Sequence, residues 1–280
     1  MRILVTGAAG LIGSGVAARL RRDHDVVGLD VTLGPQVALV ADIRDPVDLA
    51  GYDAIVHVAA LHAPHVGRAS DADFRSVNVD ATARLLDAAL AAGVTRFVYT
   101  SSTSVYGFAL EPADGRAAWI DEHVEPRPRD IYDETKLQAE ALVRAAGIPG
   151  AILRMSRCFP EPLAVMTLHR LHRGIDRRDV AEAHSLALGL APLDCETFVV
   201  SAPPPFAPDD CDELFRDAPA AIRRRAPILA EAFARRAWRL PGSIGRVYSP
   251  ARAAGLLGFA ARYGAAAVLA GDCDPPPAPS

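Results

Sequence analysis

The sequence of 280 residues is very poor in lysine. Among its 30 lysine and arginine residues, only Lys136 is a lysine. Arginine serves as well wherever a positive charge on the surface is enough, so this lone lysine marks a place where side-chain shape matters. Lys136 lies four residues after Tyr132, and two residues at that spacing share one face of a helix. The pair is therefore a candidate for a chemical role.

Cysteine is also scarce. The four cysteines are scattered and form no C-x-x-C pair; they are Cys158, Cys195, Cys211 and Cys273. This distribution argues against a zinc site, and no metal-binding residues are predicted. We interpret the cysteines as free thiols of a protein in a reducing, cytoplasmic environment.

Long apolar runs and an excess of basic charge are absent too. No stretch of about 18 uninterrupted apolar residues occurs, so no transmembrane helix is predicted. The first residues, MRILVTG, lack the layout of a signal peptide. The formal net charge of −4 gives no reason to expect nucleic acid or an anionic membrane as a partner.

The first half of the chain alternates short apolar runs with helical patterns. Runs rich in valine and isoleucine predict strands at 3–7, 25–30, 54–60, 96–102 and 150–155. Helical patterns separate them, among others near 76–92 and near 130–146. Strands and helices that alternate in this way are typical of βαβ units. We therefore predict a doubly wound α/β fold of the Rossmann type, with a parallel sheet, for residues 1–155.

The second half has a less regular pattern. Residues 177–191 have a helical pattern, 197–202 form a late strand that returns to the sheet, and 212–241 are mostly helical. We predict a reduced, partly discontinuous substrate-binding region over 156–272 and a disordered tail over 273–280.

A glycine-rich turn, TGAAGLIG, joins the first predicted strand to the first helix. It contains Gly7, Gly10 and Gly13. Glycines at this spacing permit a tight turn and let the backbone approach a pyrophosphate at the helix N-terminus. A turn without a ligand is the alternative, but the strand before it and the helix after it favour a dinucleotide site, to which we also assign Leu11 and Ile12.

Asp30 closes the second predicted strand, 17 residues after Gly13. A carboxylate there accepts hydrogen bonds from adenosine ribose hydroxyls and repels a 2′-phosphate, so it favours NAD over NADP. No arginine stands at positions 31–35 to hold such a phosphate. Asp42 and Ile43 of the ADIRD segment are expected to flank the adenine, unless that segment is an ordinary loop.

These motifs together resemble the extended short-chain dehydrogenase/reductases, the NAD-dependent epimerase/dehydratase group. The resemblance rests on TGAAGLIG, ADIRD, HVAA (57–60), NVDAT (78–82), YTSSTSVYG (99–107), YDETK (132–136) and LRMSRCF (153–159). It implies NAD as the cofactor, a homodimer, and a cofactor groove that includes Ala59. Asn78 is expected either to hold a helix in shape or to bind near the nicotinamide ribose. His57 is expected to be structural rather than a base.

The family's catalytic pattern is a serine or threonine plus Tyr-x-x-x-Lys. Carried over, it implies Tyr132 as the general acid/base and Lys136 as its partner, which also binds the nicotinamide ribose. It implies Ser102 as the hydroxyl that orients the substrate, with Ser101 and Thr103 as alternatives. A tyrosine of pKa about 10 is a poor base at neutral pH, but a cation within about 4–6 Å lowers that pKa. The alternative for Lys136 is a surface lysine on an amphipathic helix.

The resemblance also bears on the reaction. Dehydratases of the family follow the catalytic hydroxyl with an Asp-Glu pair, which is absent here. Only 24 residues separate Arg154 from Asp179, far fewer than in nucleotide-sugar epimerases of the family. We therefore predict an NAD-dependent oxidoreductase of a small sugar-like substrate. The alternatives are an epimerase with tightly bound NAD, and a non-catalytic NAD-binding scaffold.

The short form resembles uronate dehydrogenases, through CFPEP (158–162). Those enzymes hold the substrate carboxylate with an arginine shortly after this motif, where this sequence has Met166. Arg170 and Arg173 are the predicted substitutes, and Thr103 is a further predicted substrate contact. The resemblance thus implies a small sugar or polyol without identifying a uronate.

Overall fold

The computed structural model describes residues 1–112, 114–190 and 195–273. The chain divides into two compact units. Unit 1 comprises residues 1–105, 128–154 and 180–198. Unit 2 comprises residues 106–127, 155–179 and 199–280. Compared with the predicted division after residue 155, segment 106–127 groups with the second unit and segment 180–198 with the first.

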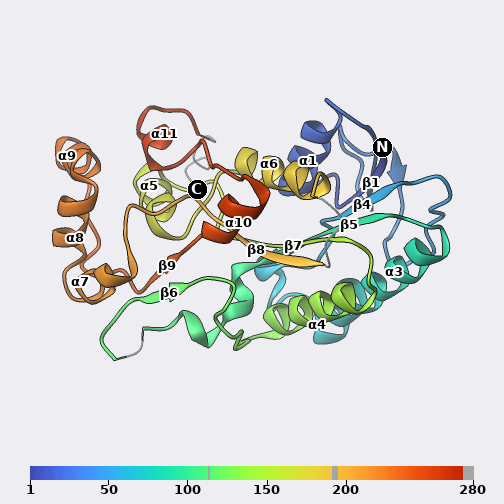
Figure 1. The fold of residues 1–280 in the computed structure, drawn as a ribbon, viewed down its shortest axis with the longest axis horizontal. Helices are drawn as coiled ribbons and strands as arrows, with labels where there is room; N and C mark the ends of the chain where they lie inside the picture. Colours follow the sequence, from blue (N-terminus) through green and yellow to red (C-terminus); the bar gives the residue numbers. More distant parts are fainter. Residues whose placement is uncertain (113, 191–194, 274–280) are drawn as a thin grey trace. The chain divides into compact units, whose positions relative to one another are not determined.

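The main sheet has seven strands in the order β3-β2-β1-β4-β5-β7-β8 (Figure 1). Its strands are β1 (Arg2–Thr6), β2 (Asp25–Asp30), β3 (Leu39–Val40), β4 (Ala54–His57), β5 (Arg96–Ser102), β7 (Gly150–Met155) and β8 (Glu196–Val200). β1 pairs in parallel with both β2 and β4, and β4 pairs in parallel with β5. The predicted doubly wound α/β fold is confirmed. Strand order reverses at β1, and ligands bind such sheets at the carboxyl ends of the strands near that point.

The strands of this sheet are apolar because both of its faces are covered. Ile3, Leu4 and Val5 of β1 are fully buried, as are all four residues of β4. Parallel strands covered on both faces are near-continuous apolar runs, which is the pattern that predicted them. β2, β5 and β7 have the predicted bounds, whereas β1 ends one residue early, because Gly7 turns the chain with a φ of 72°.

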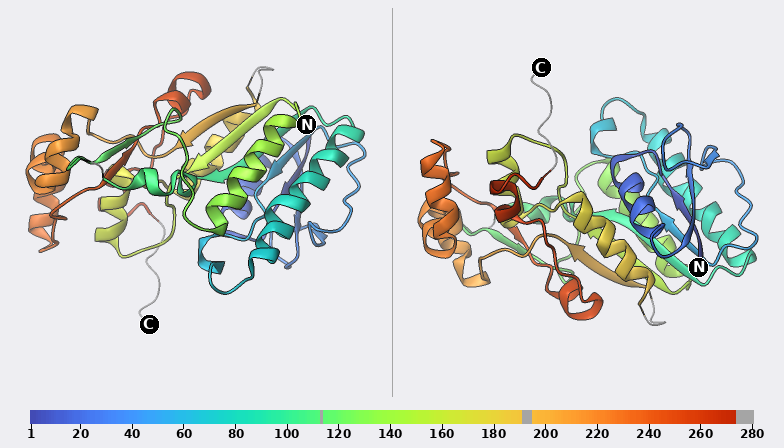
Figure 2. Two further views of the ribbon diagram at one scale, coloured as in Figure 1. Left: turned by 90° about the horizontal axis from the view of Figure 1, so that it is seen from below. Right: turned by 90° about the horizontal axis from the view of Figure 1, so that it is seen from above.

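Helices cover both faces of the sheet. They are α1 (Leu11–Leu20), α2 (Asp71–Arg75), α3 (Ala81–Ala91), α4 (Ile131–Ala145) and α6 (Arg177–Leu188). Figure 2 shows α3 and α4 side by side over one face, and α1 and α6 over the other. Arg19 Nε of α1 donates to Glu182 Oε2 of α6 at 2.6 Å, which links the second pair. The helix predicted near 76–92 begins with a π-helical turn, Ser76–Asp80, before α3.

Unit 2 has its own small core. It contains a two-stranded parallel sheet of β6 (Ala118–Ile120) and β9 (Arg246–Tyr248). Its helices are α5 (Leu163–His172), α7 (Cys211–Arg216), α8 (Ala218–Arg225), α9 (Pro227–Arg235), α10 (Ala251–Leu257) and α11 (Ala265–Leu269). Leu214, Ile222 and Phe233 are at most 1% exposed and pack together between them. The helical segment predicted over 212–241 is thus three short helices, and Pro227 begins the last because proline fits the first helical position.

Further sequence predictions concern membrane-spanning segments, the C-terminal tail and the cysteines. No helix among residues 1–112, 114–190 and 195–273 is long and apolar enough to cross a membrane. The tail predicted to be disordered lies, apart from Cys273, outside the described residues. The four cysteines are free thiols, of which Cys158 and Cys211 are buried.

Candidate active site

The glycine-rich turn presses closely against the loop that follows β4. A β-carbon on Gly7 would lie 2.7 Å from the backbone nitrogen of Ala59, and one on Gly13 would lie 2.0 Å from the carbonyl oxygen of Gly7. Real β-carbons do not approach backbone atoms so closely, so both positions require glycine. The turn therefore brings bare backbone to the end of β1, as a pyrophosphate-binding turn needs.

The N-terminus of α1 is open to an anion. Its N-cap, Gly10, offers no side-chain acceptor, and the first turn holds no acidic residue. The first N–H groups of a helix lack partners inside the helix, and their dipoles favour negative charge. Leu11 is 37% exposed and Ile12 is half-buried beside this end. These features are compatible with the pyrophosphate of a dinucleotide, and the assignment of Leu11 and Ile12 to its site stays a prediction.

Asp30 lies beside the glycine-rich turn at the end of β2. Its Oδ2 accepts from the N–H of Ala9 at 3.0 Å, and its Oδ1 accepts from the N–H of Thr32 at 3.0 Å. Each carboxylate oxygen has two lone pairs, so both oxygens retain capacity for hydroxyl donors. The side chain is half-buried, which leaves it accessible to a ligand.

Asp42 and Ile43 lie on the loop after β3. Arg44 binds the Asp42 carboxylate through Nε at 3.0 Å and Nη2 at 2.5 Å, and this hydrogen bonding lowers the pKa of Asp42. Ile43 is 6% exposed, with its side chain in the core under α3. Only the backbone of Ile43 therefore remains for a ligand, and the adenine contact stays a prediction.

His57 is held in one tautomer by two threonines. Thr6 Oγ1 accepts from the N–H groups of Val58 and Ala59 at 3.1 and 3.2 Å, so it donates its own proton to His57 Nδ1 at 2.7 Å. Thr82 Oγ1 donates to a backbone carbonyl, so it accepts from His57 Nε2 at 2.9 Å. Burial, with a smaller contribution from a nearby lysine charge, lowers the pKa of His57 to about 3. A neutral, saturated imidazole fits the expected structural role.

Asn78 joins the loop after β4 to α4. Its Oδ1 accepts from the N–H of Leu61 at 2.8 Å, and its Nδ2 donates to the carbonyl of Leu61 at 2.9 Å and to Thr135 Oγ1 at 3.1 Å. The residue is 1% exposed. Both N–H donors of its amide are used inside the protein, which favours the first of the two expected roles, that of holding a helix in place.

α4 places Tyr132 and Lys136 on its buried face. The helix begins after Asp130, whose Oδ1 accepts from the N–H of Asp133 at 3.0 Å. Tyr132 is 8% exposed and Lys136 is 2% exposed, although both carry polar groups. The interpretation of Lys136 as a surface lysine is therefore wrong. Residues four apart on a helix are neighbours, so the ammonium and the phenol share one face.

Lys136 is anchored to the end of β5. Its Nζ donates to the carbonyl oxygen of Thr100 at 2.8 Å and lies 4.6 Å from the centre of the Tyr99 ring. An ammonium has three donors, and the described residues accept only one of them by a hydrogen bond. Burial lowers the pKa of Lys136 to about 7, and the charge of Glu140 opposes that shift.

The two serines that end β5 differ in their surroundings. Ser101 Oγ donates to Glu140 Oε1 at 2.6 Å in the interior. Ser102 is half-buried, and its Oγ accepts from the N–H of Ser104 at 3.1 Å. Successive strand residues point to opposite faces, so only one of the pair can serve a ligand on a given side. Because Ser101 is committed to Glu140, the geometry favours Ser102; Thr103, just after it, is 5% exposed.

A buried ionic network beneath α4 is absent from the sequence predictions. Glu140 is fully buried and accepts from Arg154 Nε at 2.9 Å and Arg154 Nη2 at 2.7 Å, in a bidentate pair. Arg144 Nη2 donates to the same carboxylate at 2.9 Å. One signal was available, because Glu140 follows Lys136 by four residues on the face that carries the buried residues of α4.

The two arginines predicted to contact the substrate lie in unit 2. Arg170 forms a buried ion pair with Asp176 at 2.8 Å, and its Nη1 donates to the carbonyl of Tyr263 at 3.0 Å. Arg173 instead lines a pocket, and its Nη2 donates to His169 Nε2 at 2.8 Å. Arg170 thus has an internal partner for its charge, whereas Arg173 borders open space. Both substrate contacts stay predictions.

Comparison with known proteins identifies the family. A family model described as the NAD dependent epimerase/dehydratase family matches residues 3–162, which is more than half of the chain. The chain belongs to the NAD dependent epimerase/dehydratase family. The resemblance inferred from the motifs is confirmed, and the family's cofactor is the one that the glycine-rich turn and Asp30 fit.

Relatives of the chain include enzymes of two kinds. It is 30% identical over 220 residues to the L-arabinose 1-dehydrogenase (NAD(P)(+)) of Haloferax volcanii, covering 70% of this chain and 79% of that protein. It is 32% identical over 204 residues to the uncharacterized UDP-glucose epimerase YtcB of Bacillus subtilis, of which it spans 61%. That share is less than two thirds of the epimerase's length.

Solved structures share the fold across nearly the whole chain. A short-chain dehydrogenase/reductase superfamily protein from Agrobacterium tumefaciens, with bound NAD, is similar with a TM-score of 0.73. The two chains are 24% identical, and the match covers 97% of this chain and 96% of that one. At this identity the likeness shows the fold.

Proposed function

We propose that this protein is an NAD-dependent oxidoreductase that moves hydride between the nicotinamide and a hydroxyl- or carbonyl-bearing carbon of a small sugar-like molecule. The observation that carries the proposal is the pair on α4, where a buried ammonium lies one turn from the phenol of Tyr132. Bound NAD would supply the hydride acceptor. A matched relative named as an L-arabinose 1-dehydrogenase supports a free sugar as the substrate.

Tyr132 is the proposed acid/base. A carbinol can release hydride only if its hydroxyl proton is also removed, and the phenolate of Tyr132 would accept that proton. A Lys136 cation on the same helix face would favour the phenolate, the form that acts as a base. Ser102, at the end of β5, would orient the substrate oxygen.

Lys136 must keep its charge for this purpose, although it is buried. Burial lowers its pKa to about 7, so the charged form needs support at neutral pH. Glu140, one turn further along α4, opposes the shift by its negative charge. We assign Glu140 a positioning role, because it stabilises the cation without needing to contact the substrate.

The residues proposed to hold NAD lie at the carboxyl ends of β1, β2 and β4. Gly7, Gly10 and Gly13 would admit the pyrophosphate, and Asp30 would accept from the adenosine ribose. Lys136 has ammonium protons left for the nicotinamide ribose. Asp30 also makes NAD the expected cofactor in preference to NADP. The same proposal includes a homodimer, which the family resemblance implies, and a cytoplasmic location, which the free thiols favour.

A second candidate is a sugar or nucleotide-sugar epimerase that keeps NAD bound and returns the hydride to the other face of the substrate. It is favoured by the match to an uncharacterized UDP-glucose epimerase over 61% of this chain. Such an enzyme would produce no net NADH, and the cofactor would remain with the protein through gel filtration. A non-catalytic scaffold is less consistent with the burial of Lys136, which costs free energy.

The test is to incubate the protein with NAD and a panel of aldoses, uronates and polyols while following NADH absorbance. We expect turnover on at least one compound, and a loss of about 100-fold or more in the Tyr132→Phe variant with NAD binding retained. Tyr52→Phe is the matched control, because the Tyr52 ring lies under Arg2 and Tyr52 is not one of the proposed site residues. Interconversion of UDP-sugars without release of NADH would refute the dehydrogenase proposal and support the epimerase. Unchanged turnover in Tyr132→Phe would refute its role.

A further inference from the structure

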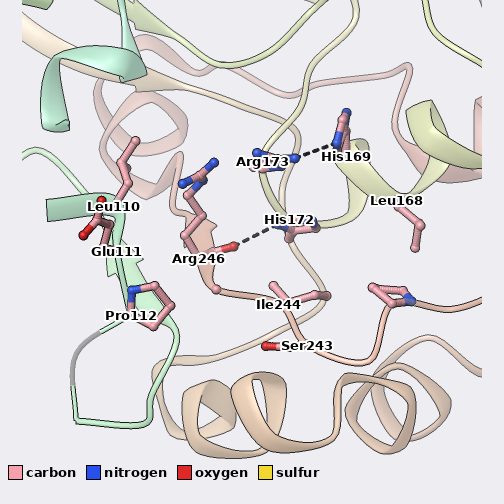
Figure 3. A pocket seen from close by; sticks show the side chains of 12 residues that line it. Leu110, Glu111, Pro112, Leu168, His169, His172, Arg173, Ser243, Ile244 and Arg246 are labelled. Atoms are coloured by element: carbon pink, nitrogen blue, oxygen red, sulfur yellow. Dashed lines mark hydrogen bonds between the residues drawn. The ribbon is translucent and has the colours of Figure 1, made fainter. Parts of the chain in front are cut away.

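Unit 2 contains a pocket of about 350 Å³. Figure 3 shows the side chains around it, which come from the end of α5, from segment 241–246 and from segment 110–112. Leu168 and Ile244 supply apolar walls, while Arg173 and Arg246 supply charge. A cavity of this size lies at the small end of the range for ligand sites, and is suited to a single sugar ring.

The two arginines of this pocket lack a carboxylate partner among the described residues. Within residues 1–112, 114–190 and 195–273, no ion pair within 4.0 Å involves Arg173 or Arg246, and the Nε of each is buried without a hydrogen-bond partner. Arg173 makes one side-chain hydrogen bond, to His169, and the Arg246 guanidinium makes none in the described chain. The two fully buried arginines of the described chain, Arg154 and Arg170, each lie beside a carboxylate. Within the described chain, neither guanidinium of this pocket therefore forms an ion pair with a carboxylate.

The histidines beside the arginines do not change this balance. His169 Nδ1 donates to Glu161 Oε2 at 2.7 Å, which leaves its Nε2 to accept from Arg173. His172 Nδ1 donates to the carbonyl of Arg246 at 2.8 Å, and burial lowers the pKa of His172 to about 3. Both rings are therefore neutral at physiological pH. The Glu161 carboxylate already accepts hydrogen bonds from Arg157 and His169.

Two unpaired guanidinium groups in one place are unfavourable unless something compensates. Burial, followed by the charge of Arg246, lowers the pKa of Arg173. Each orphan N–H also carries the cost of desolvation without a hydrogen bond. Glu111 borders the pocket but is exposed and forms no ion pair with either arginine in the described chain. An oxyanion is the group that arginine recognises best, because its oxygens accept from planar N–H donors in pairs.

We propose that this pocket binds the carboxylate or phosphate group of a small sugar-like molecule, and that Arg173 and Arg246 hold the anion. The assignment gives Arg173 a defined ligand chemistry and adds Arg246, for which no role was predicted. Binding of the anion does not depend on hydride transfer. Its identification as the enzyme's substrate rests on the function proposed above.

The first test uses the wild-type protein and three probes of similar size. Calorimetry with D-glucuronate, D-glucose 6-phosphate and neutral D-glucose separates the carboxylate, the phosphate and the sugar ring. We expect at least one anion to bind about 10-fold or more tightly than glucose, as charge-assisted hydrogen bonds to two arginines imply. The tighter of the two anions identifies the group. Equal affinity for all three probes would overturn the proposal without any variant.

The second test removes each arginine. Arg173→Gln and Arg246→Gln should each weaken anion binding about 10-fold and leave glucose binding unchanged. Arg223→Gln, an exposed position on α8, should bind like the wild type. Glu111→Gln should strengthen anion binding slightly, because a negative charge leaves the rim. Circular dichroism checks folding, and anion affinity equal to the wild type in both folded arginine variants would overturn the assignment.

The two proposals fail in different ways. Anion binding that needs both arginines, without NADH from any substrate, would sink the oxidoreductase proposal and leave the anion site. NADH production from neutral sugars, with no preference for anions in binding or turnover, would sink the anion site and leave the oxidoreductase. Turnover preferring the anion that binds, with KM raised and kcat retained in Arg246→Gln, would support both.

Discussion

The buried carboxylate of Glu140 should contribute substantially to the free energy of unfolding of the protein. Replacement by Gln removes its charge but keeps its shape, and so takes this carboxylate away from the buried Arg154 cation. Arg154 is 5% exposed, and it loses a bidentate contact with N–O distances of 2.9 and 2.7 Å. Breaking a buried ion pair from one side costs about 3–5 kcal/mol. We therefore expect Glu140→Gln to lower the free energy of unfolding by that amount.

The assay is urea denaturation followed by circular dichroism at neutral pH, with the change read from the midpoint at constant slope. Glu134→Gln on the same helix is the matched control. Glu134 is paired with Arg75 at 3.6 Å, and the side chains are 47% and 46% exposed. Exposed pairs contribute about 0–1 kcal/mol, so the control should lie near the wild type. A loss below about 1 kcal/mol in Glu140→Gln would refute the reasoning.

The same variant should show a defined pH dependence. Burial alone would raise the pKa of Glu140, but hydrogen bonds and charges from Arg154, Ser101 and Arg144 lower it below the ordinary 4.5. A carboxyl group with a lowered pKa stabilises the fold above its unfolded-state pKa and loses that effect as pH falls through its folded-state pKa. The gap between the wild type and Glu140→Gln should be full above pH 4.5 and shrink below it. A gap independent of pH would show that packing, not charge, is responsible.

Two further predictions concern the proposed cofactor site. Gly13→Ala should lose NAD binding about 10-fold or more in calorimetry, because the new β-carbon would lie 2.0 Å from the Gly7 carbonyl oxygen. Gly15→Ala, which meets nothing within 4 Å, should bind NAD normally, and equal binding by both variants would contradict the tight turn. Lys136→Met should change the pH dependence of stability, because burial lowers the pKa of Lys136 to about 7 from 10.5 and only the unfolded chain keeps the proton between those values. The stability of the wild type relative to Lys136→Met should therefore rise across that range in urea titrations, and a constant difference would count against a buried, titrating lysine.

Local signals predicted much of unit 1. β2, β5 and β7 have the bounds expected from their apolar runs, because parallel strands covered on both faces leave a strong pattern. By contrast, β6 and β9 pair in unit 2 although each has only three residues and they lie far apart in the chain. Such short strands show no periodicity of their own, so no pattern in the sequence could pair them.

The candidate site divides in the same way. The spacing of Tyr132 and Lys136 predicted that they share one helical face. The spacing of the glycines in TGAAGLIG predicted the tight turn. The choice between Ser101 and Ser102 needed the structure, because it depends on which serine meets Glu140 across the fold. That carboxylate also pairs with Arg154, which lies on β7, and no sequence pattern predicted this pairing.

The sequence by itself determined the family, the cofactor expected for it, and the residue types of the proposed proton-transfer set, because these depend on short spacings within single turns and helices. Tertiary structure decided which polar groups are satisfied. It gave Arg170 an internal carboxylate partner, left Arg173 and Arg246 without an ion pair among the described residues, and satisfied both ring nitrogens of His57. The physical reason is that charge pairing and burial depend on neighbours brought together from distant parts of the chain.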